Sequence, residues 1–286
     1  MTSLLLSIVF STILVVFFKL FARLGVNNLL AIVINYITAA ITGMLILPFS
    51  LKQAFESPWW FHTLILGIVF VSIFLVMALT TQKAGMAVTS VAGKMSMVIP
   101  VMVGVLYFKE QLNSLQWIGL ATAFLAVLAI SFRKDQVKPS IWVILLPFVL
   151  FIGSGFIDTY LNVAQKLLIN EDEFVPFTSL VFLFAFMSGA FFLTVQTIRN
   201  HELPTVKSIV AGILLGIFNW GSLFFLLRAL RFAEFPSAVL FAFNNIGIVI
   251  ASAITGILLF REKYVWINYV GLILSVLAII FLNGEL

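Results

Sequence analysis

The chain has 286 residues, of which 63% are apolar and only 9% are charged, and its formal net charge is +5. With 31 phenylalanines, this composition excludes a soluble globular domain. The absence of cysteine excludes disulfides and thiolate metal sites. The basic residues stand singly at the ends of apolar runs, which indicates head-group anchors and excludes nucleic acid as a partner.

Apolar runs long enough to cross a bilayer recur along the whole sequence. A spanning helix needs roughly 20 residues, so the chain accommodates about ten spans with short connections. We therefore expect an all-α polytopic membrane protein of ten transmembrane helices. The predicted spans cover residues 3–24, 28–50, 61–82, 87–107, 115–132, 140–165, 176–199, 205–231, 236–260 and 264–283. The first run has no basic segment before it and no small-residue cleavage pattern, so we expect it to be an uncleaved span.

Span two carries two polar residues, Asn35 and Tyr36, in its middle. An amide inside a bilayer needs a hydrogen-bond partner, so it either joins helices or binds substrate. The sequence leaves both interpretations open.

Lys94 is the clearest candidate for a functional residue. It lies in span four, about 10 Å below the surface at which that span begins, and a charged side chain at that depth is costly. We expect it to bind a carboxylate or phosphate, or to act in gating. The alternative is a structural lysine that donates to backbone carbonyls at a bend caused by Pro100.

Asp158 is the only acidic residue well inside a span. Together with Ser154, Asn162 and Gln165 it forms one polar face of span six. A carboxylate in a cavity of low dielectric can carry the coupling proton. The alternative is an anchoring ion pair, for which Arg228 lies at a suitable depth, whereas Lys94 lies nearer the opposite surface. The acidic cluster of residues 171–173, which follows span six, is interpreted as a solvated loop.

Polar residues also mark spans eight and nine. Asn219 and Trp220 lie in the middle of span eight, and Asn244 and Asn245 lie in span nine. These four residues are candidates for substrate binding, with helix joining as the alternative. The small-xxx-small motif formed by residues 212–216 of span eight predicts close helix packing.

The second half of the sequence repeats the first. Residues 87–111 read AVTSVAGKMSMVIPVMVGVLYFKEQ, and residues 238–263 read AVLFAFNNIGIVIASAITGILLFREK. In this alignment Asn244-Asn245 stand where Gly93-Lys94 stood, and the charged corner Phe-Lys-Glu returns as Phe-Arg-Glu. The polar segment 133–139 separates the copies, which gives one repeat over residues 1–138 and a second over residues 139–286. Leucine-rich membrane helices also match by chance, but the matched corners favour a duplication.

An odd number of spans in each repeat means that the second repeat enters the membrane from the opposite face. The sequence therefore predicts two inverted five-helix repeats, the architecture of many secondary transporters. Lysine and arginine are more frequent in the loops after odd-numbered spans, ten against five, which places the termini outside the cytoplasm.

The repeat endings FKEQLNSLQWIGLATAFLAVLAI and FREKYVWINYVGLILSVLAII resemble those of the drug/metabolite transporter superfamily, in particular its ten-span EamA-like members. The resemblance implies gradient-coupled transport, often export, of small metabolites such as amino acids across the bacterial inner membrane. It also implies that both termini are cytoplasmic, against the charge count. Lys19 matches a lysine that members often carry late in span one. Members often carry an arginine in span two, where this chain has Asn35-Tyr36, so the substrate stays open.

We therefore expect a secondary transporter that works by alternating access and moves a small anionic or zwitterionic metabolite such as an amino acid. No nucleotide-binding loop is present, so the energy must come from a proton or solute gradient. A channel or lipid scramblase that uses the same cavity is the alternative. An intramembrane enzyme is disfavoured, because no metal-ligand motif, paired intramembrane acids or nucleophile elbow is present. We expect no cofactor and no metal.

Overall fold

The computed structural model describes residues 2–83, 92, 93, 95–131, 141–200, 205–232, 235–260 and 265–283, and within these ranges the secondary structure is entirely helical. Seven of the described helices contain a segment long and apolar enough to cross a bilayer, and two more contain shorter apolar segments. The chain is thus a polytopic helical membrane protein. In chain order the helices are α1 (Thr2–Leu24), α2 (Asn28–Ile46), α3 (Leu51–Glu56), α4 (Trp60–Lys83), α6 (Val98–Leu106), α7 (Ser114–Ser131), α8 (Ile141–Leu167), the 3-10 turn η1 (Glu171–Glu173), α9 (Phe174–Asn200), α10 (Val206–Phe232), α11 (Ser237–Phe260) and α12 (Trp266–Asn283).

Local sequence signals account for the turn between α1 and α2. Gly25 follows α1 with a φ of +64°, a left-handed conformation that glycine adopts without strain. Asn27 then caps α2, because its side-chain oxygen accepts a hydrogen bond from the backbone N–H of Leu30 at 3.1 Å. The hydroxyl of Ser208, on α10, accepts from the backbone N–H of Asn27 at 2.9 Å, which ties this turn to the second half of the chain.

Nine of the ten predicted spans coincide with described helices to within four residues at each end. The largest difference is in α2, which ends at Ile46 rather than at residue 50 because Pro48 follows its last turn. The short helix α3 comes next and was not predicted, since its six residues are too few to show a period. Its first turn is capped by Ser50.

The local structure of two segments differs in detail from the sequence-based expectation. Span four was predicted as one helix bent at Pro100, whereas Ser96 and Met97 form a turn and α6 begins at Val98. Pro100 therefore lies in the first turn of α6, where its missing N–H costs nothing. The acidic segment 171–173 connects α8 and α9, and Asp172 is exposed as predicted; the segment forms a 3-10 turn, in which Glu173 accepts a hydrogen bond from the indole of the buried Trp59 at 2.8 Å.

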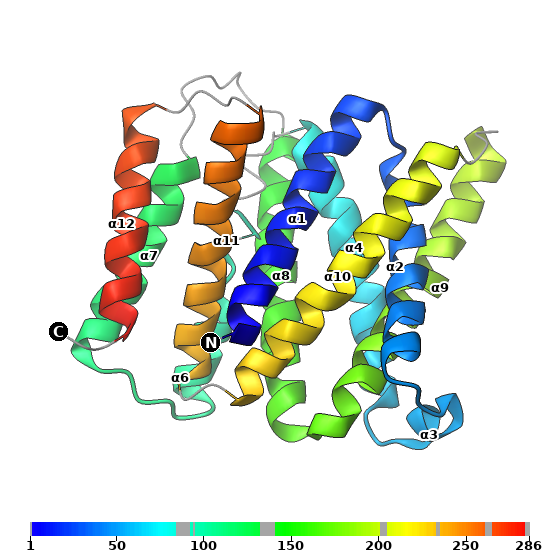
Figure 1. Ribbon diagram of the computed structural model, residues 1–286, viewed down its shortest axis with the longest axis horizontal. Coiled ribbons are helices and arrows are strands. Elements are labelled where there is room, and N and C mark those ends of the chain that lie inside the picture. The colour runs from blue at the N-terminus through cyan, green and yellow to red at the C-terminus, as the bar shows by residue number, and fades with distance from the viewer. Residues whose placement is uncertain are drawn as a thin grey trace.

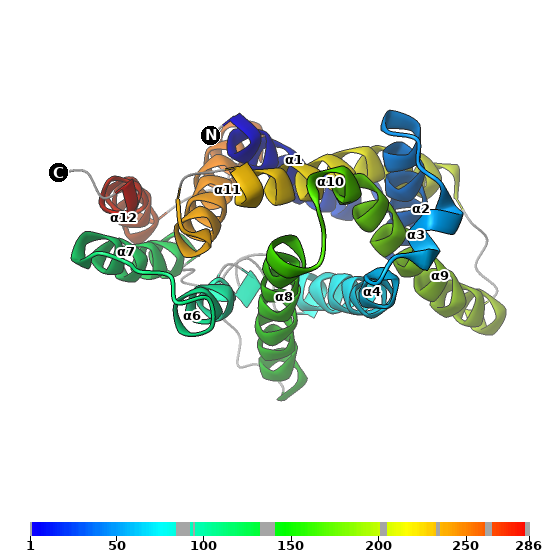
Figure 2. The same cartoon turned by 90° about the horizontal axis from the view of Figure 1, so that it is seen from below.

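The helices form two rows when the bundle is viewed along its helices (Figure 2). One row contains α11, α1 and α10, and the other contains α6, α8 and α4; within each row the middle helix packs against both neighbours. The helices α2 and α9 pack against each other at one edge, and α7 and α12 do so at the other (Figure 1). The first residue of α1 and the last residue of α12 lie toward the same end of the bundle.

Small residues set the closest helix contact, that between α2 and α10. A Cβ on Gly212 would stand 2.6 Å from the backbone oxygen of Ala31, and one on Gly216 would stand 2.5 Å from that of Asn35. The predicted packing role of this motif is confirmed. The largest buried apolar cluster lies around this contact and draws on α2, α4, α8, α9 and α10.

Candidate functional site

The first group of polar side chains inside the bundle lies where α2, α9 and α10 meet. Tyr36, from α2, is fully buried and stacks on Phe182 of α9, with ring centroids 6.1 Å apart. Trp220, from α10, is 6% exposed and stacks on Phe224 at 4.9 Å. Both residues belong to one buried cluster, so the structure brings together one residue from each of two pairs predicted from the sequence.

Gly43 of α2 makes room for two polar atoms from the other helices. A Cβ on this residue would stand 2.0 Å from the hydroxyl oxygen of Ser179 and 2.7 Å from the indole nitrogen of Trp220. Tyr36 lies seven residues, or two turns, earlier on the same face of α2. Sequence analysis missed Ser179, because a serine inside an apolar run gives no signal that distinguishes a site from ordinary packing.

The polar atoms of this group have unused hydrogen-bonding capacity. Within the described residues, the Tyr36 and Ser179 hydroxyls and the Trp220 indole nitrogen have no hydrogen-bond partner, although all three atoms are buried. A buried polar group without a partner costs roughly 1–3 kcal/mol. Each of the three groups can donate a proton, so together they match an acceptor such as a carboxylate. We refer to Tyr36, Ser179 and Trp220 as the donor group.

Two amides border the donor group. Asn35 is fully buried, and its side-chain nitrogen donates to the backbone oxygen of Ile32 at 3.4 Å. Its side-chain oxygen, like the side-chain nitrogen of Asn219, has no partner within the described part of the chain. An acceptor on α2 and a donor on α10 thus add to the polar character of this interior.

The remaining predicted site residues lie elsewhere. Asn244 and Asn245 are buried on α11, between Phe243 and Ile246, which belong to a different apolar cluster from Tyr36 and Trp220. Asp158 is half-buried on α8. Lys19 lies near the end of α1 with its ammonium nitrogen 4.4 Å from the centroid of the Phe260 ring. The prediction for Lys94 falls on a residue outside the described ranges.

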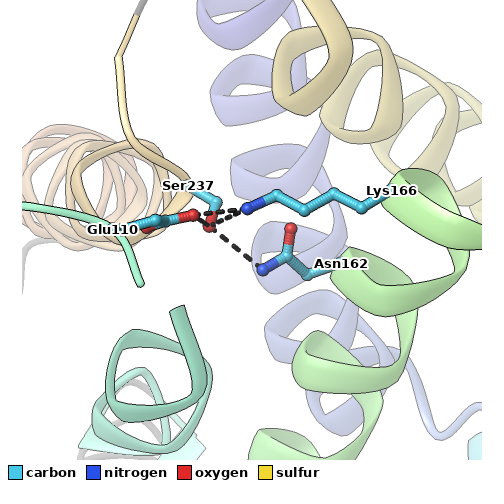
Figure 3. Close-up of polar contacts among 4 residues, drawn as sticks. All are labelled: Glu110, Asn162, Lys166 and Ser237. Atoms are coloured by element: carbon cyan, nitrogen blue, oxygen red, sulfur yellow. Dashed lines mark hydrogen bonds and ion pairs between the residues drawn. The ribbon is translucent and has the colours of Figure 1, made fainter. Parts of the chain in front are cut away.

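A second polar group, not predicted as a site, lies at the end of the bundle where α6 and α8 end and α11 begins (Figure 3). Its carboxylate comes from Glu110, which follows α6. Lys109 adopts a left-handed conformation with a φ of +56°, and the Glu110 backbone N–H donates to the Gly104 oxygen at 3.1 Å. This turn directs the chain back, so that Glu110 contacts α8 and α11 rather than solvent.

Four side chains form a connected network here, which we call the Glu110 cluster: Glu110, Asn162, Lys166 and Ser237 (Figure 3). One carboxylate oxygen of Glu110 accepts hydrogen bonds from the Lys166 ammonium and, at 2.5 Å, from the Ser237 hydroxyl. The Ser237 oxygen accepts in turn from Lys166 at 3.3 Å and from the Asn162 amide at 3.0 Å. Every donor in this chain of contacts thus has a matching acceptor.

The ion pair of the Glu110 cluster is shielded from solvent. The side chains of Glu110 and Lys166 are 11% and 25% exposed, and the Lys166 ammonium lies 4.1 Å from the centroid of the Phe108 ring. Charge-assisted hydrogen bonds in such an environment are stronger than at an exposed surface. The sequence contained part of the signal, because Lys166 follows Asn162 by four residues and extends the predicted polar face of α8.

Among the described residues, no group of three or more histidine, cysteine, aspartate or glutamate side chains lies close enough together to hold a metal ion.

Comparisons with known proteins reach the fold but not a function. No family model matches the chain. Over 262 residues the chain is 29% identical to an uncharacterized protein of Haemophilus influenzae, and this alignment covers 87% of this chain and 86% of that protein. It is also similar to a protein of known crystal structure, with a TM-score of 0.73 over 98% of this chain and 96% of that one, at 13% identity. The second similarity shows that the whole chain has a helix arrangement already seen in a solved structure.

Proposed function

We propose that this protein is a secondary active transporter of a small anionic or zwitterionic metabolite, such as an amino acid, and a member of the drug/metabolite transporter superfamily. In this proposal the chain has ten spans in two inverted halves, residues 1–138 and 139–286. The halves move against each other to expose a central site alternately to the two sides of the membrane. Transport in this proposal is driven by a gradient, is directed outward and involves no chemical conversion of the solute.

The pattern of helix contacts supports the two halves. Helix α1, from the first half, packs against α10 and α11 of the second half. Its counterpart α8, from the second half, packs against α4 and α6 of the first half, which are the counterparts of α10 and α11. The counterpart pairs α2–α9 and α7–α12 also pack together. A two-fold exchange of the halves therefore reproduces the main contacts, as expected for helices related by a duplication.

The first turns of α7 and α12 support the same duplication. At the start of α7 the side chain of Gln116 accepts a hydrogen bond from the backbone N–H of Asn113 at 3.0 Å. At the start of α12 the side chain of Asn268 accepts from the backbone N–H of Val265 at 2.8 Å. Each acceptor stands three residues after its donor, and each lies 152 residues from its counterpart, the separation of Glu110 and Glu262.

The observation that carries the proposal is the donor group. Tyr36 comes from residues 1–138, and Ser179 and Trp220 come from residues 139–286, so both proposed halves contribute to the group. Polar groups inside a bilayer are costly and commonly mark substrate pathways. Three proton donors suit the carboxylate of an anionic or zwitterionic solute.

Solute uptake into proteoliposomes tests the proposal. We would screen amino acids, organic acids and phosphorylated metabolites, with and without a pH gradient. For a transported solute, Tyr36→Phe, Ser179→Ala and Trp220→Phe keep most of the side-chain volume but remove a donor. Each is expected to lower the initial rate by roughly tenfold, the effect of one hydrogen bond to a charged group.

The matched control is Trp266→Phe, because Trp266 is 75% exposed on α12 and lies outside the donor group. Lys94→Ala enters the same assay, and loss of uptake would add Lys94 to the substrate site. Uptake no faster than in protein-free vesicles across the whole screen would overturn the transporter proposal. If all three donor variants take up the solute as fast as the wild type, the donor group is not the substrate site.

A further inference from the structure

The Glu110 cluster joins the two rows of helices at one end of the bundle. Ser237 is the first residue of α11, in one row, while Lys166 lies in the last turn of α8, in the other (Figures 2 and 3). Glu110 contacts both of them directly. Separation of the rows at this end therefore requires that the contacts of Glu110 break.

A related contact lies at the opposite end of α11. Phe260 is the last residue of this helix, and its ring lies 4.4 Å from the Lys19 ammonium and 4.8 Å from the Arg23 guanidinium, both on α1. At the first end, the Lys166 ammonium lies 4.1 Å from the ring of Phe108. Both ends of the bundle thus hold a cation over an aromatic ring.

The repeat relates the two contacts to each other. Phe108 aligns with Phe260, and Glu110, two residues after the first ring, aligns with Glu262, two residues after the second. The cations come from the ends of α8 and α1, which are counterparts in the two halves. Glu262 itself lies outside the described residues.

We propose that these two contacts are the gates of the transporter. The Glu110 cluster closes the end where α8 terminates, and the contact of Phe260 with Lys19 and Arg23 closes the end where α1 terminates. This inference rests on the proposed alternating-access function. In such a cycle one gate opens while the other is closed, so weakening one gate shifts the population toward the state that is open at that end.

Cysteine accessibility measures which end is open without any knowledge of the substrate. The chain contains no cysteine, so a single introduced thiol has no background. Thr159 on α8 and Ser252 on α11 suit this purpose, because their hydroxyl oxygens are buried and have no hydrogen-bond partner in the described part of the chain. They lie roughly 10 Å inward from Lys166 and roughly 12 Å inward from Phe260, at 1.5 Å per helical residue.

The experiment compares the rates at which a charged thiol reagent modifies Thr159→Cys and Ser252→Cys in purified protein. Adding Glu110→Gln or Lys166→Met is expected to raise the rate at position 159 by roughly tenfold, the effect of one charge-assisted hydrogen bond, and to lower the rate at position 252. Adding Phe260→Leu or Lys19→Met, which remove the ring or the cation at the other end, is expected to have the reverse effect at both positions.

The control is Glu56→Gln on α3. Glu56 pairs with Lys52 at 3.8 Å, but both side chains are largely exposed, so neither rate is expected to change. Rates that do not change in the gate variants, or that change in the same direction at both reporters, would show that the contacts only stabilise the fold. If Glu110→Gln does not yield folded protein, Ser237→Ala removes one hydroxyl of the same gate and is judged by the same outcomes.

A charge reversal adds an independent arm. If the ion pair is what closes the gate, Glu110→Lys combined with Lys166→Glu restores the wild-type rate at both reporters, whereas either reversal alone does not. Thiol modification needs no solute. If the modification rates at the two reporters shift in opposite directions but proteoliposomes take up no solute, the gate proposal stands and the substrate proposal is overturned. Uptake without opposite shifts would overturn the gates alone.

Discussion

Gly216 of α10 lies against the backbone carbonyl of Asn35 on α2, at a distance that leaves no room for a side chain. Gly212, one turn earlier, lies in the same way against Ala31. Backbone atoms cannot move aside as a flexible side chain can. This close approach places α2 and α10 side by side and so brings Tyr36 and Trp220 into one buried cluster.

Gly216→Ala is therefore expected to destabilise the protein by roughly 1–3 kcal/mol, because the new methyl group forces α10 away from α2. Helix propensity acts in the opposite direction and alone would stabilise by about 0.5–1 kcal/mol. Thermal unfolding in detergent, followed by tryptophan fluorescence, decides between them. Ile217→Ala, at a neighbouring exposed position, is the control. An unchanged or higher melting temperature for Gly216→Ala would contradict the packing argument.

Gly104→Ala is expected to affect the gate more than stability. A Cβ on Gly104 would stand 2.8 Å from a carboxylate oxygen of Glu110, which is the far end of a side chain and can move. The free energy of unfolding should change by less than about 1 kcal/mol, because higher helix propensity offsets part of the crowding. Reagent access at Thr159→Cys should rise as it does with Glu110→Gln. An unchanged access rate would show that Glu110 accommodates the methyl group without leaving Ser237.

Glu173→Ala is expected to destabilise the connection between α8 and α9. One carboxylate oxygen accepts from the indole of Trp59, and the other accepts from the backbone and side chain of Asn170 at 2.8 and 3.0 Å. Loss of the carboxylate leaves the indole N–H of Trp59, which is 2% exposed, without its acceptor, at a cost of roughly 1–3 kcal/mol.

A double-mutant cycle isolates this hydrogen bond from other effects of losing the carboxylate. Trp59→Phe combined with Glu173→Ala should cost less than the sum of the two single changes, because neither partner is then left unpaired. Additive costs in thermal unfolding would assign the stabilisation to the bonds with Asn170 instead. Glu56→Ala, at an exposed carboxylate, is the matched control.

Asn268→Leu is expected to destabilise the protein more than Asn113→Ala. Asn113 caps α7 by accepting from the backbone N–H of Gln116 at 2.8 Å, a bond whose loss costs about 1 kcal/mol. Asn268, in the first turn of α12, accepts from the backbone N–H of Val265 at 2.8 Å and also donates to the backbone oxygen of Ala129 on α7 at 3.1 Å, so its loss removes a contact between helices as well. Equal shifts in melting temperature would show that the bond to Ala129 contributes little.

Sequence patterns predicted the helices well because spans depend on local properties, namely apolar length and the polar residues that bound it. They also predicted the face of α8 that contains Asn162, since residues four apart on a helix are neighbours. The pair of Glu110 and Lys166 was not predicted. Its members are 56 residues apart, and only the packing of α6, α8 and α11 brings them together.

The donor group shows the same limit in another form. Tyr36 and Trp220 were candidates because a polar side chain in an apolar run is visible in sequence. Ser179 was not, because its importance depends on Gly43, a residue of another helix that leaves space for it. Which of several polar residues meet in space is a property of tertiary packing. For that reason the sequence did not show that the apolar neighbours of Asn244 on α11 belong to a different cluster from Tyr36 and Trp220.

The common direction of the two chain ends has a practical consequence for protein engineering. Because α1 begins and α12 ends toward the same end of the bundle, a short hydrophilic linker can join two copies head to tail without an additional membrane crossing. Both copies of such a concatemer would insert with the same orientation. A variant placed in only one copy would then report whether neighbouring subunits work independently, from a single polypeptide of defined stoichiometry.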